Sequence, residues 1–199
     1  VTTNDKNKQK SSGGQIVTDN TAAEFHCTII TIAPSSLDAR VIWVGTDDGN
    51  VQVTRDGGTS WTSVFKNVPG LAPFAWISRI DAGHFDAGTA FVSASHWQDN
   101  DYAPYLYKTS DFGKTWTKIT TGLPARGWSH VVREDPRARD VLYAGTENGL
   151  YASWDGGARW VSIRNNMPAV PVRDIVIHPR DNDIIVATHG RGIYILDSA

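Results

Sequence analysis

The sequence has few of the residues and segments that support disulfide bonding, membrane insertion or binding to polyanions. Cys27 is the single cysteine among 199 residues, so no intramolecular disulfide can form, and its apolar surroundings indicate a buried free thiol. No apolar run reaches the ~18 residues of a membrane-spanning helix. The 19 Lys and Arg nearly balance the 21 Asp and Glu, which leaves a net charge of −2. We therefore expect neither a nucleic-acid partner nor a membrane span.

Helical periodicity is missing as well. From residue 25 onward, short β-branched runs alternate with turns rich in Gly, Asp and Pro, which is typical of an all-β protein. The first 14 residues differ, because they are polar, rich in Lys and end in Ser-Ser-Gly-Gly. Such a composition buries too little apolar surface to fold alone. We predict that residues 1–14 are a polar arm or linker and that residues 15–199 form the folded domain.

One pattern occurs three times and organises the rest of the chain. It reads (Ser/Thr)-x-Asp-x-Gly-x-x-Trp, and we call it the Asp-Gly-Trp motif; it spans residues 54–61, 109–116 and 153–160. The Asp can accept backbone N–H bonds in a tight turn, the Gly can take a positive φ, and the Trp can bury a large flat surface. We expect structural roles for Asp56, Gly58, Trp61, Asp111, Gly113, Trp116, Asp155, Gly157 and Trp160.

Around these motifs the strand-like runs come in groups of four, which we call blades. The expected blades span approximately residues 25–66, 75–121, 128–165 and 172–199, and residues 15–18 could add a short strand. Successive motif Asp residues are 55 and 44 positions apart, as in propeller blades. The fourth group has three strands and lacks the motif. The sequence therefore predicts about three and a half blades of four antiparallel strands, as part of a larger β-propeller.

The motif resembles the Asp-box, or BNR, repeat of a β-propeller superfamily that includes sialidases, xyloglucan-degrading hydrolases, sortilin-type receptors and photosystem II assembly factors. Residues 44–49, 132–136 and 187–192 look most like the C-terminal propeller of large bacterial secreted proteins described as sortilin-like or glycosyl hydrolase-like. The resemblance covers roughly residues 15–199. It implies a β-propeller fold and a secreted, periplasmic or cell-envelope location.

An incomplete ring leaves strand edges and apolar blade flanks uncovered. We therefore expect further blades, from a longer parent polypeptide or from a second chain, to complete a ring of about six to eight blades. The alternative is a four-bladed ring in which residues 15–18 pair with residues 192–196.

Blade two carries an insertion, residues 95–104, where blades one and three have a tight turn between their second and third strands. Its length and aromatic content predict a contact surface for a protein or glycan ligand, on the face opposite to the Asp-Gly-Trp turns. The candidate partner-binding residues on this face are His96, Trp97, Asp99, Asp101, Tyr102, His189 and Arg191.

Other residues of that face have structural explanations as well. Turn formation explains Asp47, Asp48 and Glu147, and packing between blades explains Trp76 and Trp128, while His130 is a further candidate.

Signatures of catalysis are incomplete. A glycoside hydrolase needs two carboxylates, which Asp81, Glu134 and Asp135 could supply near the central channel. A sialidase-like site needs converging arginines; Arg79, Arg133 and Arg173 lie in the innermost strands, but local pairs such as Arg79 with Asp81 and Arg173 with Asp174 explain them too. The six His show no metal-ligand spacing, and no phosphate-binding Gly loop is present, so we expect no metal or cofactor.

Two classes of function remain. The favoured one is a non-catalytic propeller that binds a protein or glycan or serves as a subunit of a larger assembly, since fold alone confers no activity. The alternative is a sialidase-like or xyloglucanase-like glycoside hydrolase with part of its active site on the missing blades. A pair of buried, converging carboxylates with raised pKa values would favour the hydrolase.

Overall fold

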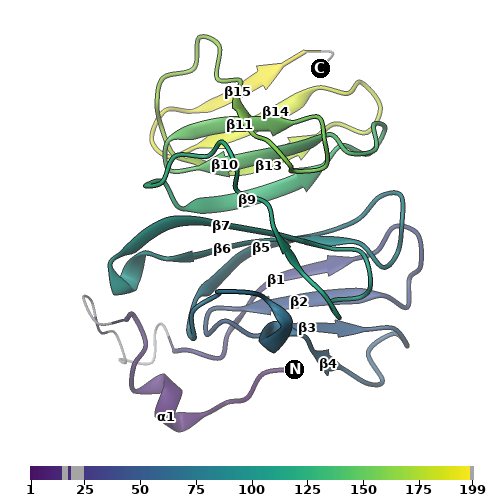
Figure 1. Cartoon of the computed structure of the whole chain (residues 1–199), viewed down its shortest axis with the longest axis vertical. Helices are drawn as coiled ribbons and strands as arrows, with labels where there is room; N and C mark the ends of the chain where they lie inside the picture. The colour runs from purple at the N-terminus through teal and green to yellow at the C-terminus, as the bar shows by residue number, and fades with distance from the viewer. Residues whose placement is uncertain (15–17, 19–24, 198–199) are drawn as a thin grey trace.

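The computed structural model describes residues 1–14, 18 and 25–197. Four antiparallel sheets follow one another along the molecule, with blade one and the N-terminal segment at one end and blade four at the other (Figure 1). Within every sheet the strands neighbour one another in chain order. The expected all-β architecture of three and a half blades is confirmed. Residues 15–17, part of the additional strand that we considered, lie outside the described residues.

The strand bounds show how the blades are built. Blade one contains β1 (Ile29–Pro34), β2 (Ile42–Thr46), β3 (Val51–Thr54) and β4 (Thr62–Ser63), and blade two contains β5 (Trp76–Ala82), β6 (Ala90–His96), β7 (Asp101–Thr109) and β8 (Thr117–Lys118). Blade three contains β9 (Ser129–Glu134), β10 (Leu142–Thr146), β11 (Gly149–Ser153) and β12 (Val161–Ser162), and blade four contains β13 (Val172–Ile177), β14 (Ile184–Thr188) and β15 (Ile193–Leu196). The described residues also form the short helices α1 (Lys6–Gln9), η1 (Phe65–Asn67) and η2 (Trp97–Asp99).

Two features of the strands were not evident from the sequence. The outermost strands of blades one to three have only two residues each. In each of these blades the backbone makes one further ladder bond, such as Val64 N–H to the Val51 carbonyl, and then leaves the sheet. The insertion is not an open loop, because β6 and β7 extend into it as a hairpin in which His96 pairs with Asp101. Between them lies η2, followed by Asn100 in the left-handed conformation.

The Asp-Gly-Trp turns repeat one bonding pattern. In the second copy, the Asp111 carboxylate accepts the Thr109 hydroxyl at 2.9 Å, the Thr115 N–H at 2.9 Å and the Thr115 hydroxyl at 2.6 Å. Asp56 and Asp155 accept the equivalent hydroxyl and N–H bonds. The motif glycines Gly58, Gly113 and Gly157 all have positive φ.

Blades two to four turn one face to the preceding blade, and blades one to three turn the other face to the following one. The third-strand residues Tyr107 and Tyr151 are in register with Val92 and Ala144, and their rings pack into clusters with the preceding blade. Tyr194 of blade four packs in the same way against blade three. The motif tryptophans use the same side: Trp116 contacts Trp43 of blade one edge to face, and Trp160 donates to the Ile119 carbonyl of blade two at 2.6 Å.

The opposite faces are equally regular, but blade four lacks a neighbour among the described residues. Val51, Leu106 and Leu150 face the following blade from the third strand of blades one to three and are buried. The equivalent residue of blade four, Ile193, is 69% exposed. Trp61 of blade one, expected to be buried like the other motif tryptophans, is only half-buried, because no preceding blade is present among the described residues to cover it.

No helix in the described part of the chain is long and apolar enough to cross a membrane.

Candidate functional site

A β-bulge at the same place in all four innermost strands shapes one end of the molecule. The register between first and second strand shifts by one residue between Ile29 and Thr31, and again at the equivalent positions of β5, β9 and β13. Bulges of this kind redirect a side chain. The extra residues of the four blades are Ile30, Ser78, His130 and Arg173.

All four bulge residues line one cavity of about 890 Å³, a volume typical of ligand sites. Four aromatic side chains contribute to its wall, namely Phe25, Phe74, Trp76 and Trp97. The polar lining comes from several segments and consists mainly of Lys10, Ser11, Thr18, His26, Thr28, Asp47, Ser95, Gln98 and Asp99. The cavity therefore joins the N-terminal segment, the strand ends and η2.

In one part of the cavity lining, the Arg173 guanidinium is held by the buried imidazole of His130. Arg173 Nη1 lies 3.2 Å from His130 Nδ1, and His130 Nε2 lies 2.8 Å from Glu147 Oε2. Because a guanidinium only donates, Nδ1 accepts and Nε2 carries the proton that is donated to Glu147. Burial lowers the pKa of His130 despite the neighbouring Glu147. A neutral His130 thus fixes Arg173 at the cavity wall.

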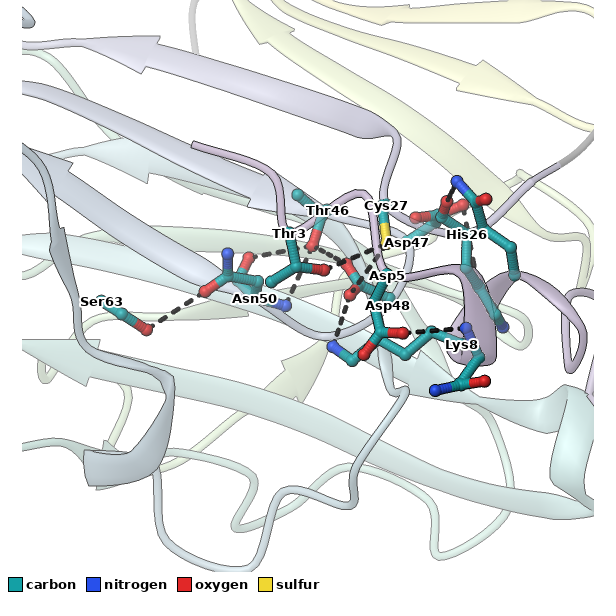
Figure 2. A network of polar contacts seen from close by, with 12 residues as sticks. Thr3, Asp5, Lys8, His26, Cys27, Thr46, Asp47, Asp48, Asn50 and Ser63 are labelled. Carbon is teal, nitrogen blue, oxygen red and sulfur yellow. Dashed lines mark hydrogen bonds and ion pairs between the residues drawn. The ribbon is translucent and has the colours of Figure 1, made fainter.

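Another part of the cavity lining is formed around Asp47 and His26, which Figure 2 shows beside the N-terminal segment. Asp47 accepts the Thr28 N–H at 2.8 Å, and its carboxylate lies 3.7 Å from His26 Nδ1. The interaction with Asp47 raises the pKa of His26, although burial opposes the shift. The Asp47 carboxylate therefore favours the protonated form of His26 next to the cavity.

The insertion residues divide into those at the cavity and those that fix the insertion. Trp97 and Asp99 line the cavity, and Asp99 is paired with His96 at 2.8 Å. Tyr102 packs on Trp128. Asp101 accepts the Ala103 N–H at 3.0 Å and the Tyr105 hydroxyl.

Trp128 is the contact between this hairpin and blade three. Its ring stacks on Trp97 at 6.2 Å and meets His130 edge to face at 6.0 Å. Arg126 lies over the Tyr102 ring at 4.9 Å from the centroid. The remaining two candidates, His189 and Arg191, are exposed in the turn between β14 and β15 and are not among the residues that line the cavity.

The three candidate catalytic carboxylates all have structural bonds. Asp81 binds Arg133 at 2.9 Å and the Glu134 N–H at 2.9 Å. Glu134 accepts the His84 N–H at 2.6 Å, and burial raises its pKa. Asp135 accepts the N–H groups of the turn that follows it, at 2.8 and 3.0 Å. None of the three lines the large cavity.

The expected local arginine pairs were wrong. Asp174 binds Arg79 at 2.7 Å and Arg133 at 3.2 Å, so the pairs join blades two, three and four. Arg79 does not use Asp81 because Arg133 occupies that carboxylate. Arg173 does not use Asp174 because the bulge directs it to the cavity. The part of the chain that the structure describes holds no group of three or more His, Cys, Asp or Glu that could bind a metal.

Solved structures identify the fold. YCF48 bound to a D1 peptide superposes with a TM-score of 0.60 at 16% identity over 85% of this chain and 51% of that chain. The chain is part of a β-propeller. The GH74 xyloglucanase from Xanthomonas campestris gives a TM-score of 0.67 at 17% identity over 85% of this chain and 29% of its own. The GH74 enzyme from Niastella koreensis gives 0.64 at 18% identity over 85% and 28%.

No protein-family model matches the sequence, and no curated protein matches it significantly. The chain spans about half or less of the length of the propellers named above. At such identities the likeness shows the fold alone.

Sequence reasoning missed most of the cavity. Ile30, Ser78 and the N-terminal wall at Lys10 were not candidates, although Asp47, His130 and Arg173 were considered. Hydrophobic alternation predicts a regular strand and contains no sign of an inserted bulge residue. An alignment of the first strands of the four blades could have shown that these residues occupy equivalent positions.

Proposed function

We propose that this propeller is a non-catalytic binding module whose cavity takes a segment of a protein ligand. The observation that carries the proposal is the convergence of four bulge residues from four blades on one cavity with an aromatic wall. Rigid sheets position these side chains, as binding sites require. The YCF48 propeller, solved with a peptide, supports a peptide rather than a glycan as the ligand of this chain.

The cavity offers two kinds of contact to a peptide. Trp97 is partly exposed at the cavity and can pack against an apolar side chain, while its stacking on Trp128 keeps it in place. Arg173 and Lys10 provide donors, and Asp47 and Asp99 provide acceptors. An extended segment with alternating apolar and polar groups matches this lining.

The test is a screen of immobilised peptides and glycans with three variants. Trp97→Ala and Arg173→Ala should weaken peptide binding at least ~10-fold, because anchors in a pocket dominate affinity. The matched control is Trp154→Ala, since Trp154 is exposed and belongs to an Asp-Gly-Trp turn rather than to the cavity. Binding of glycans alone, or peptide binding that survives both cavity substitutions, would overturn the proposal.

Glycoside hydrolysis is the alternative, and the raised pKa of Glu134 beside Asp81 is the observation that favours it. Against it stand the backbone and arginine bonds that occupy both carboxylates. Release of reducing sugar from xyloglucan or sialic acid from sialosides, lost in Glu134→Gln and kept in Glu147→Gln, would decide for the hydrolase.

We also propose that a further blade packs against blade four. Ile193, Ile195 and Val176 are exposed on the face that blades one to three bury against their following neighbours. The edge of β15 also carries no fourth strand among the described residues. In blades one to three the equivalent face is covered by the following blade. We therefore expect a further blade, from a longer parent chain or from a second chain, to cover this face of blade four.

A further inference from the structure

Blade one differs from the other blades at the position that faces a preceding blade. Val44 pairs with Gln52 on the third strand, whereas the equivalent pairs of blades two to four all end in a tyrosine, as described above. Those tyrosine rings pack on the preceding blade. Gln52 cannot provide such a ring, but its amide can bond to a backbone.

The N-terminal segment occupies this position. The carbonyl of Val1 accepts a bond from Gln52 Nε2 at 2.6 Å and another from Asn50 Nδ2 at 3.1 Å. Figure 1 shows the segment on the side of blade one that faces away from blade two. Val44 is only 3% exposed, as if a preceding blade were present.

Polar contacts deep in blade one hold the segment in place (Figure 2). Lys8 Nζ lies 2.6 Å from Asp48 Oδ2, and Asp48 also accepts the Thr46 hydroxyl at 2.5 Å. Asp48 is buried, so its charge needs this partner. Thr3 Oγ1 lies 3.2 Å from the sulfur of Cys27. A contact network of this kind fixes the segment at three separate residues.

We propose that residues 1–14 are a cap that takes the place of a preceding blade on blade one, so that blade four of a second copy of the chain can pack there only after the cap has left. The cap covers the flank incompletely, because Ile32 stays exposed and Trp61 half-exposed. A blade that displaced it would bury both. Blade four carries no such cap among the described residues, so further blades add at that end first.

The first test compares two lysine variants of the full chain. Lys8→Glu places a like charge beside Asp48. Among the described residues, Lys6 instead bonds to Asn4 and Gln9 of its own segment, which makes Lys6→Glu the matched control. The amides of Gln9 and Ser11, bonded within the segment, should exchange at least ~10-fold faster in Lys8→Glu, since a four-residue helix is unstable without docking. Equal exchange in both variants would overturn the docked cap.

The second test locks the cap. In Thr3→Cys the new thiol lies next to Cys27, and oxidised glutathione should take up the two electrons and two protons of a new disulfide. Thr2→Cys is the control and should cross-link far less. Sedimentation velocity then measures self-association: Lys8→Glu should associate at least ~10-fold more tightly than the unmodified chain, and oxidised Thr3→Cys less tightly. If oxidised Thr3→Cys and Lys8→Glu associate equally tightly, the cap does not exclude a blade. This outcome is independent of whether the cavity binds a peptide.

Discussion

At the scale of single residues, the three motif tryptophans give an internal comparison. Trp116 and Trp160 are buried against a preceding blade, whereas Trp61 is half-buried. Trp116→Ala and Trp160→Ala should each lower the free energy of unfolding by ~3–5 kcal/mol, and Trp61→Ala by roughly 1–2 kcal/mol, because less area leaves the core. Urea denaturation of the three variants measures this order. An equal loss in all three would mean that Trp61 is covered in solution.

The motif aspartates act as turn caps. Thr115 holds the pKa of Asp111 below its ordinary value through its hydroxyl and its N–H. Asp111→Ala should cost ~1–2 kcal/mol, as the loss of a side-chain cap does elsewhere. Because the native pKa is lowered, this contribution is present above the ordinary Asp pKa and is lost as the pH falls through the native one. Peptide binding by the cavity should stay unchanged, and its loss at wild-type stability would contradict a structural role.

Two histidines should give opposite pH dependences. The pKa of His26 is raised by Asp47, so its contribution to stability is present below the ordinary His pKa and is lost as the pH rises through the native value. The pKa of His130 is lowered by burial, so stability falls as the pH drops below the ordinary value. The free energy of unfolding is compared with that of wild type between pH 8 and pH 5. His26→Gln should be less stable than wild type mainly at pH 5, whereas His130→Gln should no longer show the loss of stability that His130 causes in wild type as the pH falls. Identical pH profiles of the two variants would refute both assignments.

At the scale of elements, close approach between blades depends on a glycine in the second strand. A Cβ atom on Gly145 would lie 2.6 Å from the carbonyl oxygen of Val172 in blade four. Gly145→Ala should therefore cost about 1–3 kcal/mol through overpacking. Ala187 is the equivalent residue of blade four, where no following blade is described, and Ala187→Ser should cost under about 0.5 kcal/mol. Thermal unfolding of both variants tests this, and a tolerated Gly145→Ala would mean that the two blades can move apart.

The repeat made the blades predictable, because one motif with Asp, Gly and Trp at fixed spacing marks the same turn three times. The insertion was located for the same reason, as a departure from the repeat. The bulges at Ser78 and Arg173 were not predictable, since a bulge changes the register without changing hydrophobic alternation. The docking of residues 1–14 on blade one was not predictable either, because its contacts are polar. One of them depends on Gln52, which occupies the position that is Tyr in the other blades.

At the scale of the whole molecule, the two ends of the arc of blades differ. Blade one meets the N-terminal segment, and blade four presents Ile193, Ile195 and Val176 to solvent. Large exposed apolar patches mark interaction sites or aggregation. The chain by itself should therefore associate through blade four.

Ile193→Asp tests this last expectation. The substitution adds a charge to an exposed residue, so the native fold should change in stability by less than ~0.5 kcal/mol. Self-association in sedimentation velocity should weaken at least ~10-fold, since a charge buried in an apolar contact is costly. Leu150→Asp, the same change at the equivalent buried position of blade three, should instead prevent folding. If Ile193→Asp associates as the unmodified chain does, the flank of blade four is not the surface to which a further blade binds.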